Sequence, residues 1–320
     1  MKIAVLDDYT NDAMRLADWG QLRGEVTVFH DTITVPSALV ARLLPFDVIC
    51  LMRERTPMGA ALIAALPNLK LIVTSGPRNA AIDLAAARAR EIPVCGTESR
   101  KTTTSELAML MILALNRRLG PEVAALHDSG WQAALGRDLA GLTLGVIGLG
   151  NIGAQMAAHG RGFGMEVIAW SQNLTAERCA EVGVRQAESL PALMAEADVS
   201  TVHLVLSERS RGLIGAEAFG AAKAGHVFVN TSRGPIVDTG ALLAGLRTGR
   251  PAMAGIDVYD VEPLPMDDPL RDAGLIGDGR LLLTPHLGYT TEATFAVFYE
   301  QTVQAVAAWQ SGAPVRVLNG

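Results

Sequence analysis

The sequence predicts an α/β fold built on two parallel sheets. Short runs rich in Val and Ile alternate with Ala-rich stretches long enough to be helices, which is typical of successive βαβ units. Aromatic residues make up 5% of the chain and apolar residues 49%, a balance suited to helices packed on buried parallel strands. With 320 residues, the chain has enough length for about two domains.

Composition excludes several other classes. The net charge is −6 and no basic cluster is denser than Arg117–Arg118, so nucleic acid is not an expected partner. The longest apolar run, Leu107–Leu115, is well short of the roughly 20 residues that span a bilayer, so no membrane segment is expected. The chain opens on a strand-like apolar run with no long h-region or small-residue cleavage site, so we expect no secretory leader. Cys50, Cys95 and Cys179 stand apart in apolar surroundings. We therefore expect reduced thiols, a cytoplasmic location and no metal site.

Two series of strand-like runs predict the two sheets. The first series lies within residues 1–100 and comprises Ile3–Leu6, Val26–Phe29, Asp47–Met52, Leu69–Thr74 and Ile92–Cys95. The second series follows Thr143 and comprises Leu144–Ile147, Glu166–Trp170, Ser200–Leu204, Val227–Asn230, Ala254–Val258 and Leu281–Leu283.

Two helices outside the βαβ pattern are also predicted. Thr103-x-x-Glu106 has the pattern of a capping box before the apolar run that ends at Leu115. Because that run is apolar on every side, we expect it to be covered on every side, between domains or subunits or inside a core. Thr291 to Gln310 reads as a final helix that could pack on the first sheet. Its expected buried residues are Phe295, Phe298, Val303, Val306 and Trp309.

A glycine-rich motif predicts a dinucleotide site. Gly148-Leu149-Gly150-Asn151-Ile152-Gly153 follows a strand and opens a helix, the context that a GxGxxG fingerprint requires. Gly148 permits the tight turn, Gly150 lets the backbone approach a pyrophosphate, and Gly153 allows close packing of helix on strand. The N–H groups of Asn151 and Ile152 would face the anion.

The end of the second strand leaves the choice of cofactor open. An acidic residue there normally accepts the ribose hydroxyls and repels a 2′-phosphate, but this chain has Ser171. No Arg stands at 171–173 to bind a 2′-phosphate. We therefore expect NAD or NADP, with NADPH accepted at least as well as NADH.

Three polar residues follow strands of the second series, where ligands bind in open α/β sheets. Arg233 can bind the carboxylate and carbonyl oxygen of a 2-keto acid with its planar fork. His286 can give a proton to the carbonyl oxygen as hydride reaches the carbon, and take it back in the reverse reaction. Glu262, as a hydrogen-bond acceptor of the imidazole, would orient the ring and stabilise its charge.

The chain resembles the D-isomer-specific 2-hydroxyacid dehydrogenase family over most of its length. The motifs stand in the family's order: Gly148–Gly153, Asn230–Asp238, Gly255–Pro263 and Thr284–Gly288. The resemblance implies that Arg233, Glu262 and His286 are catalytic. It also implies cofactor-binding roles for Asp257, which would hold the nicotinamide carboxamide, and for Thr104, His203, Thr231, Ser232 and Gly288.

The same resemblance implies an architecture. The nucleotide domain, residues 101–287, would be inserted into a substrate domain made of residues 1–100 and 288–320. Homodimers through the nucleotide domain are usual in the family, and would bury the apolar run Glu106–Leu115.

Substrate recognition is expected in the first domain. In place of the family's glycine-rich turn the chain has Gly76-Pro77-Arg78-Asn79, in which Pro77 donates no N–H. Gly76, Arg78 and Asn79 are therefore the expected contacts. Arg53 resembles arginines that phosphoglycerate dehydrogenases offer to a phosphate, although a surface salt bridge is an equally good interpretation.

The sequence thus indicates an NAD(P)-dependent oxidoreductase that interconverts a small D-2-hydroxy acid and its 2-keto acid. The substrate would be of the glyoxylate or hydroxypyruvate type or of the 3-phosphoglycerate type. The alternative is a non-catalytic NAD(H)-sensing corepressor or scaffold of the same fold.

Overall fold

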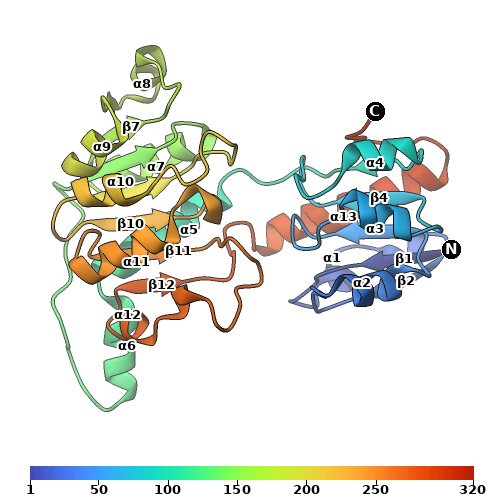
Figure 1. The fold of residues 1–320 in the computed structure, drawn as a ribbon, viewed down its shortest axis with the longest axis horizontal. Coiled ribbons are helices and arrows are strands. Elements are labelled where there is room, and N and C mark those ends of the chain that lie inside the picture. The colour runs from blue at the N-terminus through green and yellow to red at the C-terminus, as the bar shows by residue number, and fades with distance from the viewer. The chain divides into compact units, whose positions relative to one another are not determined.

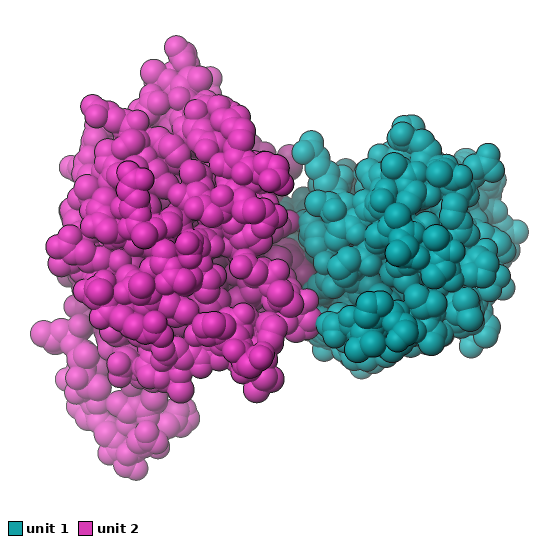
Figure 2. All heavy atoms as spheres, viewed as in Figure 1, with its two compact units in different colours: residues 1–100, 290–320 teal, residues 101–289 magenta.

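The computed structural model describes residues 1–320 and contains two compact units (Figures 1 and 2). Residues 1–100 and 290–320 form unit 1, and residues 101–289 form unit 2, so unit 2 is inserted in sequence within unit 1. The return to unit 1 thus begins at Thr290, next to the expected residue 288. Each unit holds a sheet of parallel strands covered by helices, and this confirms the predicted α/β class.

Unit 1 has a five-stranded sheet in the order β2-β1-β3-β4-β5. Its strands are β1 Lys2–Val5, β2 Glu25–Val28, β3 Val48–Leu51, β4 Leu71–Thr74 and β5 Val94–Cys95. Its helices are α1 Ala13–Leu16, η1 Trp19–Gln21, α2 Pro36–Leu43, α3 Ala60–Ala65, α4 Leu84–Ala89 and α13 Glu292–Gln310. All five expected strands are present, and β3 and β4 are buried along their whole length, as the near-continuous apolar runs predict.

Helix α13 packs on β4 and α1 of unit 1. The Thr291 side chain caps its first turn by accepting a hydrogen bond from the Thr294 N–H at 3.3 Å. Phe298 and Val303 are buried as expected, with Phe295 and Val306. Trp309 was expected to be buried but is only partly covered, because it lies in the last turn of the helix.

Unit 2 has a seven-stranded parallel sheet in the order β12-β11-β10-β9-β6-β7-β8. The strands are β6 Thr143–Ile147, β7 Glu166–Trp170, β8 Arg185–Gln186, β9 Val199–Val202, β10 Val227–Asn230, β11 Met253–Ile256 and β12 Leu281–Leu283. The six expected strands are present; β8 was missed because it is a two-residue, fully exposed edge strand with no apolar run.

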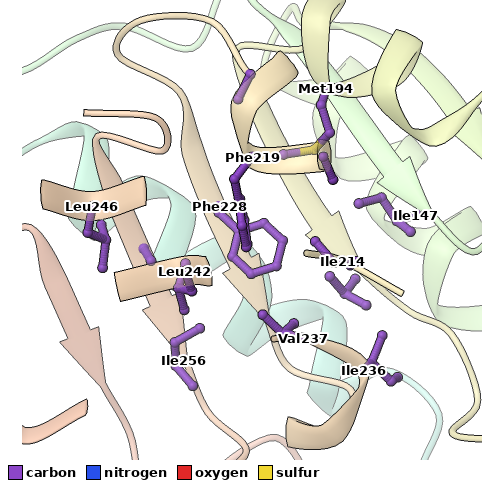
Figure 3. Close-up of a cluster of buried hydrophobic side chains, with 14 of the residues drawn as sticks. Ile147, Met194, Ile214, Phe219, Phe228, Ile236, Val237, Leu242, Leu246 and Ile256 are labelled. Atoms are coloured by element: carbon purple, nitrogen blue, oxygen red, sulfur yellow. The ribbon is translucent and has the colours of Figure 1, made fainter. Parts of the chain in front are cut away.

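The helices of unit 2 lie on both faces of this sheet (Figure 1). They are α5 Thr103–Asn116, α6 Leu119–His127, α7 Asn151–Gly162, α8 Ala176–Val182, α9 Leu190–Glu196, α10 Ala216–Ala221, η2 Gly234–Ile236, α11 Thr239–Thr248, η3 Pro269–Arg271 and α12 Ala273–Gly277. One core cluster lies between the sheet and the helices α9, α10 and α11 (Figure 3). At its centre the rings of Phe219 and Phe228 meet edge to face, with centroids 5.2 Å apart.

One expectation about α5 is wrong. Thr103 does not cap the helix: it lies inside the first turn with a buried side chain, and the N-cap residue is Thr102, whose side chain makes no capping bond. Within this chain the helix is covered on one side only. Ala108 and Ile112 are fully buried against the sheet, whereas Leu110 on the opposite face is 56% exposed, because no other part of this chain packs there.

The apolar surface that begins at Leu110 continues along the chain. Leu119, Val123 and Leu126 on α6 are exposed, as are Trp131 and Leu135 in the segment that follows. None of the helices combines the length and the apolar character needed to cross a bilayer. Leu110 and these residues are large apolar side chains of unit 2 that no other part of the chain covers.

Candidate active site

The expected site residues of unit 2 follow neighbouring strands at one edge of the sheet. All strands are parallel, so their carboxyl ends share that edge, and the chain order reverses between β9 and β6. Open α/β sheets bind ligands at such a reversal. Gly148 follows β6, Ser171 follows β7, Arg233 follows β10, and Glu262 and His286 follow β11 and β12.

The fingerprint has the geometry that close approach to an anion requires. Gly148 has φ +104°, a conformation that side chains disfavour. A Cβ at Gly153 would lie 2.1 Å from the carbonyl oxygen of Gly148, so only glycine lets α7 start this close to the strand end. Gly150 is the N-cap residue, and α7 opens with Asn151 and Ile152 at the surface of the turn. The first N–H groups of the helix are thus available to a phosphate.

A cavity of about 310 Å³ opens beside this turn. It is lined by Gly148, Leu149, Gly150, Ser171, Asn173, Leu174, Thr175, Arg178, His203, Leu204 and Val205. Ser171 and His203 were expected here. Burial lowers the pKa of His203, whose Nε2 pairs with the Thr201 hydroxyl at 2.9 Å, so the ring is neutral. Arg178 was missed by sequence reasoning, since it belongs to the next helix rather than to the strand end.

The loop after β10 contains a buried hydroxyl that lacks a partner within the protein. Thr231 Oγ1 is buried and makes no hydrogen bond, a cost that a bound polar ligand would remove. The neighbouring Ser232 hydroxyl instead donates to the carbonyl oxygen of Leu204. The fingerprint turn, the cavity beside it and the buried Thr231 hydroxyl together fit a dinucleotide.

Thr104 and Gly288, two expected cofactor residues, are in direct contact. The Thr104 hydroxyl donates to the carbonyl oxygen of Gly288 at 3.0 Å, which ties the start of α5 to the loop after β12. Both expected cofactor residues thus also hold the loop that carries His286.

Asp257 anchors the turn that contains His286. Its Oδ1 accepts hydrogen bonds from the Thr284 hydroxyl at 2.6 Å and the Leu287 N–H at 2.7 Å, and its Oδ2 accepts one from the Gly288 N–H at 2.9 Å. Burial raises the pKa of Asp257 above its ordinary value. His286 has φ +53°, an unfavourable backbone conformation that persists only when its surroundings hold it. The carboxylate of Asp257, bonded on both sides of His286, supplies that restraint.

His286 and Glu262 form a short, direct pair. The imidazole Nδ1 lies 2.6 Å from Glu262 Oε2, and Glu262 Oε1 accepts the Tyr259 N–H at 3.0 Å. Burial raises the pKa of Glu262, but the hydrogen bond and charge of His286, the Tyr259 N–H and the charge of Arg233 outweigh it and bring the pKa below its ordinary value. Glu262 is therefore a carboxylate that accepts a hydrogen bond from the Nδ1–H of His286.

Arg233 is held next to this pair by close contact between two loops. A Cβ at Gly234 would lie 2.2 Å from the carbonyl carbon of Tyr259, so glycine lets the loop after β10 touch the loop after β11. Arg233 Nη1 donates to the carbonyl oxygen of Ser232 at 2.8 Å, which fixes the direction of the guanidinium. The site therefore combines an acid/base candidate, its carboxylate partner and a cation.

The expected substrate residues of unit 1 differ in their exposure and in their hydrogen bonds within the protein. The Gly76 N–H already donates to the Thr97 hydroxyl at 2.7 Å. The Asn79 amide donates to the carbonyl oxygen of Arg53 and to the Thr74 hydroxyl, so it supports the loop. Arg78 is exposed.

Arg53 has an unusual backbone and a partly buried side chain. Its φ is +53°, its Nη1 donates to the carbonyl oxygen of Ser75 at 3.1 Å, and its Nη2 lies 3.6 Å from a carboxylate oxygen of Glu54. A salt bridge is thus present, and a cationic side chain remains at the carboxyl end of β3.

The fold and site define a protein with a Rossmann-type dinucleotide-binding unit. Residues 109–288 match the family model described as D-isomer specific 2-hydroxyacid dehydrogenase, NAD binding domain. The chain belongs to the D-isomer specific 2-hydroxyacid dehydrogenase family.

Individual relatives agree with that family. The chain is 33% identical over 273 residues to a D-3-phosphoglycerate dehydrogenase of Bacillus subtilis, covering 84% of this chain but only 50% of the relative. It is 33% identical to a hydroxypyruvate reductase of Thermotoga maritima, covering 78% of this chain and 80% of the relative. A crystal structure of a phosphoglycerate oxidoreductase from Vibrio cholerae has a TM-score of 0.90 and 36% identity, covering 98% of this chain and 100% of that one. The chain thus spans about half the length of D-3-phosphoglycerate dehydrogenases such as that of Bacillus subtilis.

Proposed function

We propose that the protein interconverts a small D-2-hydroxy acid and the corresponding 2-keto acid with a nicotinamide dinucleotide. The observation that carries the proposal is the 2.6 Å pair of His286 Nδ1 and Glu262 Oε2, with Arg233 beside it at the cofactor edge of the sheet. Arg233, Glu262 and His286 are the catalytic residues in this account.

Each of the three side chains has a distinct task in the reduction. Reduced nicotinamide, when bound, supplies the hydride that goes to the carbonyl carbon. Arg233 binds the substrate carboxylate and draws electron density from the carbonyl oxygen. The Nε2–H of His286 gives its proton to that oxygen as the carbonyl π bond breaks, and Glu262 stabilises the charged ring before the transfer. The reverse reaction returns the proton to Nε2.

The substrate is a 2-keto acid of the glyoxylate or hydroxypyruvate type or of the 3-phosphoglycerate type. A carboxylate beside the carbonyl suits Arg233. Arg53, at the carboxyl end of β3 in unit 1, is a cation that would suit an anionic substrate.

The cofactor is NAD or NADP, and we propose that NADPH binds at least as well as NADH. Ser171 stands where an acidic residue would repel the 2′-phosphate. Gly148, Gly150, Asn151, Ile152 and Gly153 would hold the pyrophosphate. Thr231, with its buried hydroxyl, and Asp257 would face the nicotinamide side.

A homodimer through unit 2 completes the proposal. Leu110 and the exposed apolar residues of α6 form a face that a second copy would cover. We expect the mass in solution, measured by light scattering, to be that of two chains, and Leu110→Asp with Leu126→Asp to give one chain. A monomeric wild-type protein at micromolar concentration would contradict this part.

The test is an initial-rate screen of glyoxylate, hydroxypyruvate, pyruvate and 3-phosphohydroxypyruvate, each with NADH and NADPH. We expect reduction of at least one keto acid, and oxidation of the D but not the L isomer of its product. Tight binding of a dinucleotide with no turnover of any of these acids would instead favour a nucleotide-sensing role.

A further inference from the structure

The cavity beside the fingerprint turn contains a cation and no carboxylate among its lining residues. Arg178 is the charged residue in that lining, apart from the neutral His203, and it is partly buried. It projects from α8, the helix that follows β7, and so faces the same strand end as Ser171. In a Rossmann-type sheet this strand end receives the adenosine ribose.

Arg178 is held over the turn by two contacts. Its Nε donates to the carbonyl oxygen of Leu149 at 3.2 Å, between the first two glycines of the fingerprint. Its Nη1 donates to Glu181 Oε2 at 3.0 Å, one helical turn further along α8. These bonds use two of the five N–H donors of a guanidinium. The remaining donors and the Ser171 hydroxyl are available at the cavity.

A second arginine contacts the same loop. Arg209 Nη2 donates to the Asn173 side chain at 3.2 Å, and Gln172 donates to the carbonyl oxygen of Arg209 at 3.0 Å. Arg209 thus supports the loop that follows β7, and Arg178 is the cation that lines the cavity. A dianion placed in the cavity meets this positive charge and no lining carboxylate.

We propose that Arg178, with the Ser171 hydroxyl, binds the 2′-phosphate of NADPH and makes the protein selective for it. The inference rests on the proposed function and adds the residue that distinguishes NADPH from NADH. The planar fork of Arg178 pairs with two phosphate oxygens while Nε keeps its bond to Leu149. The exposed carboxylate of Glu181 pairs with the same guanidinium in the protein without ligand. The phosphate therefore displaces Glu181 when it binds.

Equilibrium binding separates this site from the rest of the cofactor groove. Calorimetry compares adenosine 2′,5′-bisphosphate with adenosine 5′-monophosphate, and NADPH with NADH, on five proteins: wild type, Arg178→Gln, Arg178→Lys, Glu181→Gln and Arg161→Gln. Arg161 is the matched control, because it is an arginine of α7 that bonds the carbonyl oxygens of Val182 and Gly183 and does not line the cavity. Unchanged melting temperatures would show that the variants are folded.

We expect the wild-type protein to bind both 2′-phosphorylated compounds more tightly than their partners. Arg178→Gln should weaken only the phosphorylated ligands, by about ten- to a hundredfold, which is what loss of a charge-assisted pair brings. Arg178→Lys should restore part of the loss, and Arg161→Gln should change nothing. Glu181→Gln should leave NADH unchanged and tighten NADPH.

Two results would overturn the inference while leaving the proposed function in place. One is wild-type protein that binds NADH as tightly as NADPH. The other is Arg178→Gln weakening both cofactors by the same factor, which would assign Arg178 to the pyrophosphate turn. If the wild-type protein binds neither dinucleotide, the proposed function itself fails.

Discussion

His286 Nδ1 and Glu262 Oε2 lie 2.6 Å apart, although the two residues come from loops after different strands. The contact fixes the orientation of the imidazole and assigns Nδ1 as the nitrogen that donates to the carboxylate. Glu262 is held in turn by the Tyr259 N–H. The pair is therefore positioned by backbone as well as by side chains.

Glu262→Gln should reduce the rate of keto-acid reduction by about tenfold to a hundredfold, because the amide no longer stabilises a charged imidazole. Since the pKa of Glu262 is lowered, the wild-type carboxylate stays ionised down to acidic pH. The variant should therefore be slower than the wild type across the whole neutral pH range. Steady-state kinetics on the single variants and on Glu262→Gln with His286→Ala measure this. The double variant should be no slower than His286→Ala alone; additive losses would show that the two residues act separately.

Asp257→Asn should lower kcat by about tenfold or more because it disturbs the turn around His286. In the variant, an NH2 donor replaces one of the two carboxylate oxygens. This donor then faces the backbone N–H of Leu287 or Gly288, which can only donate as well. Thr284→Val removes only one of the three bonds and should have a smaller effect. Weaker binding of the dinucleotide with an unchanged kcat at saturation would mean that Asp257 acts on the cofactor and not on the turn.

Gly153→Ala should destabilise unit 2 by about 2 kcal/mol or more, because its Cβ would meet the Gly148 carbonyl oxygen at 2.1 Å and α7 must move off the strand. Dinucleotide binding should be lost with it. Gly162→Ala is the matched control on the same helix, where a Cβ meets nothing within 4 Å, and it should be neutral or stabilising by up to about 1 kcal/mol. Chemical denaturation and cofactor titration of both variants test this. A Gly153→Ala protein with wild-type affinity would refute the close-approach argument.

Acid should destabilise the protein through His226. Its Nδ1 donates to the carbonyl oxygen of Ala197 at 3.0 Å, and its Nε2 accepts from the Ser200 hydroxyl at 2.7 Å, so the folded state holds the neutral ring. Burial lowers the pKa of His226 to about 4. Between that value and the ordinary 6.5 the unfolded chain binds more protons, so the stability contributed by the neutral ring is complete above pH 6.5 and falls as the pH drops towards 4.

The size of that loss follows from the shift. At about 1.4 kcal/mol per pKa unit it is roughly 3 kcal/mol. Urea denaturation of the wild type and of His226→Gln between about pH 4 and pH 7 measures it. The free energy of unfolding should change less with pH in the variant, which is less stable at neutral pH. An equal pH dependence in both proteins would show that His226 does not cause the acid destabilisation.

The sheets could be read from the sequence because their strands carry strong local signals. Val227–Asn230 and Leu281–Leu283 are apolar runs bounded by turn residues, and both occur in the structure with those bounds. The edge strand Arg185–Gln186 has no such signal, since both its residues are exposed and polar. The exposure of Leu110 also could not be predicted, because apolar residues look the same whether the chain or another copy covers them.

The features of the site that could not be predicted from the sequence are those that depend on tertiary contacts. Arg178 reaches the strand end from the following helix, so its place beside Leu149 does not follow from spacing. The bonds of Asp257 to both sides of His286 depend on how the loops after β11 and β12 meet. Asn79 was expected to contact substrate, but its bonds to Arg53 and Thr74 arise from the folded loop.

The most direct test of the account is to compare wild-type protein with His286→Ala in two measurements on the same preparations: dinucleotide binding, and reduction of the best keto acid from the screen. We predict equal dinucleotide affinity and a fall in kcat of at least about a hundredfold, because the variant lacks the proton donor. A variant that binds the cofactor and keeps wild-type turnover would contradict the central claim that His286 is the acid/base of this site.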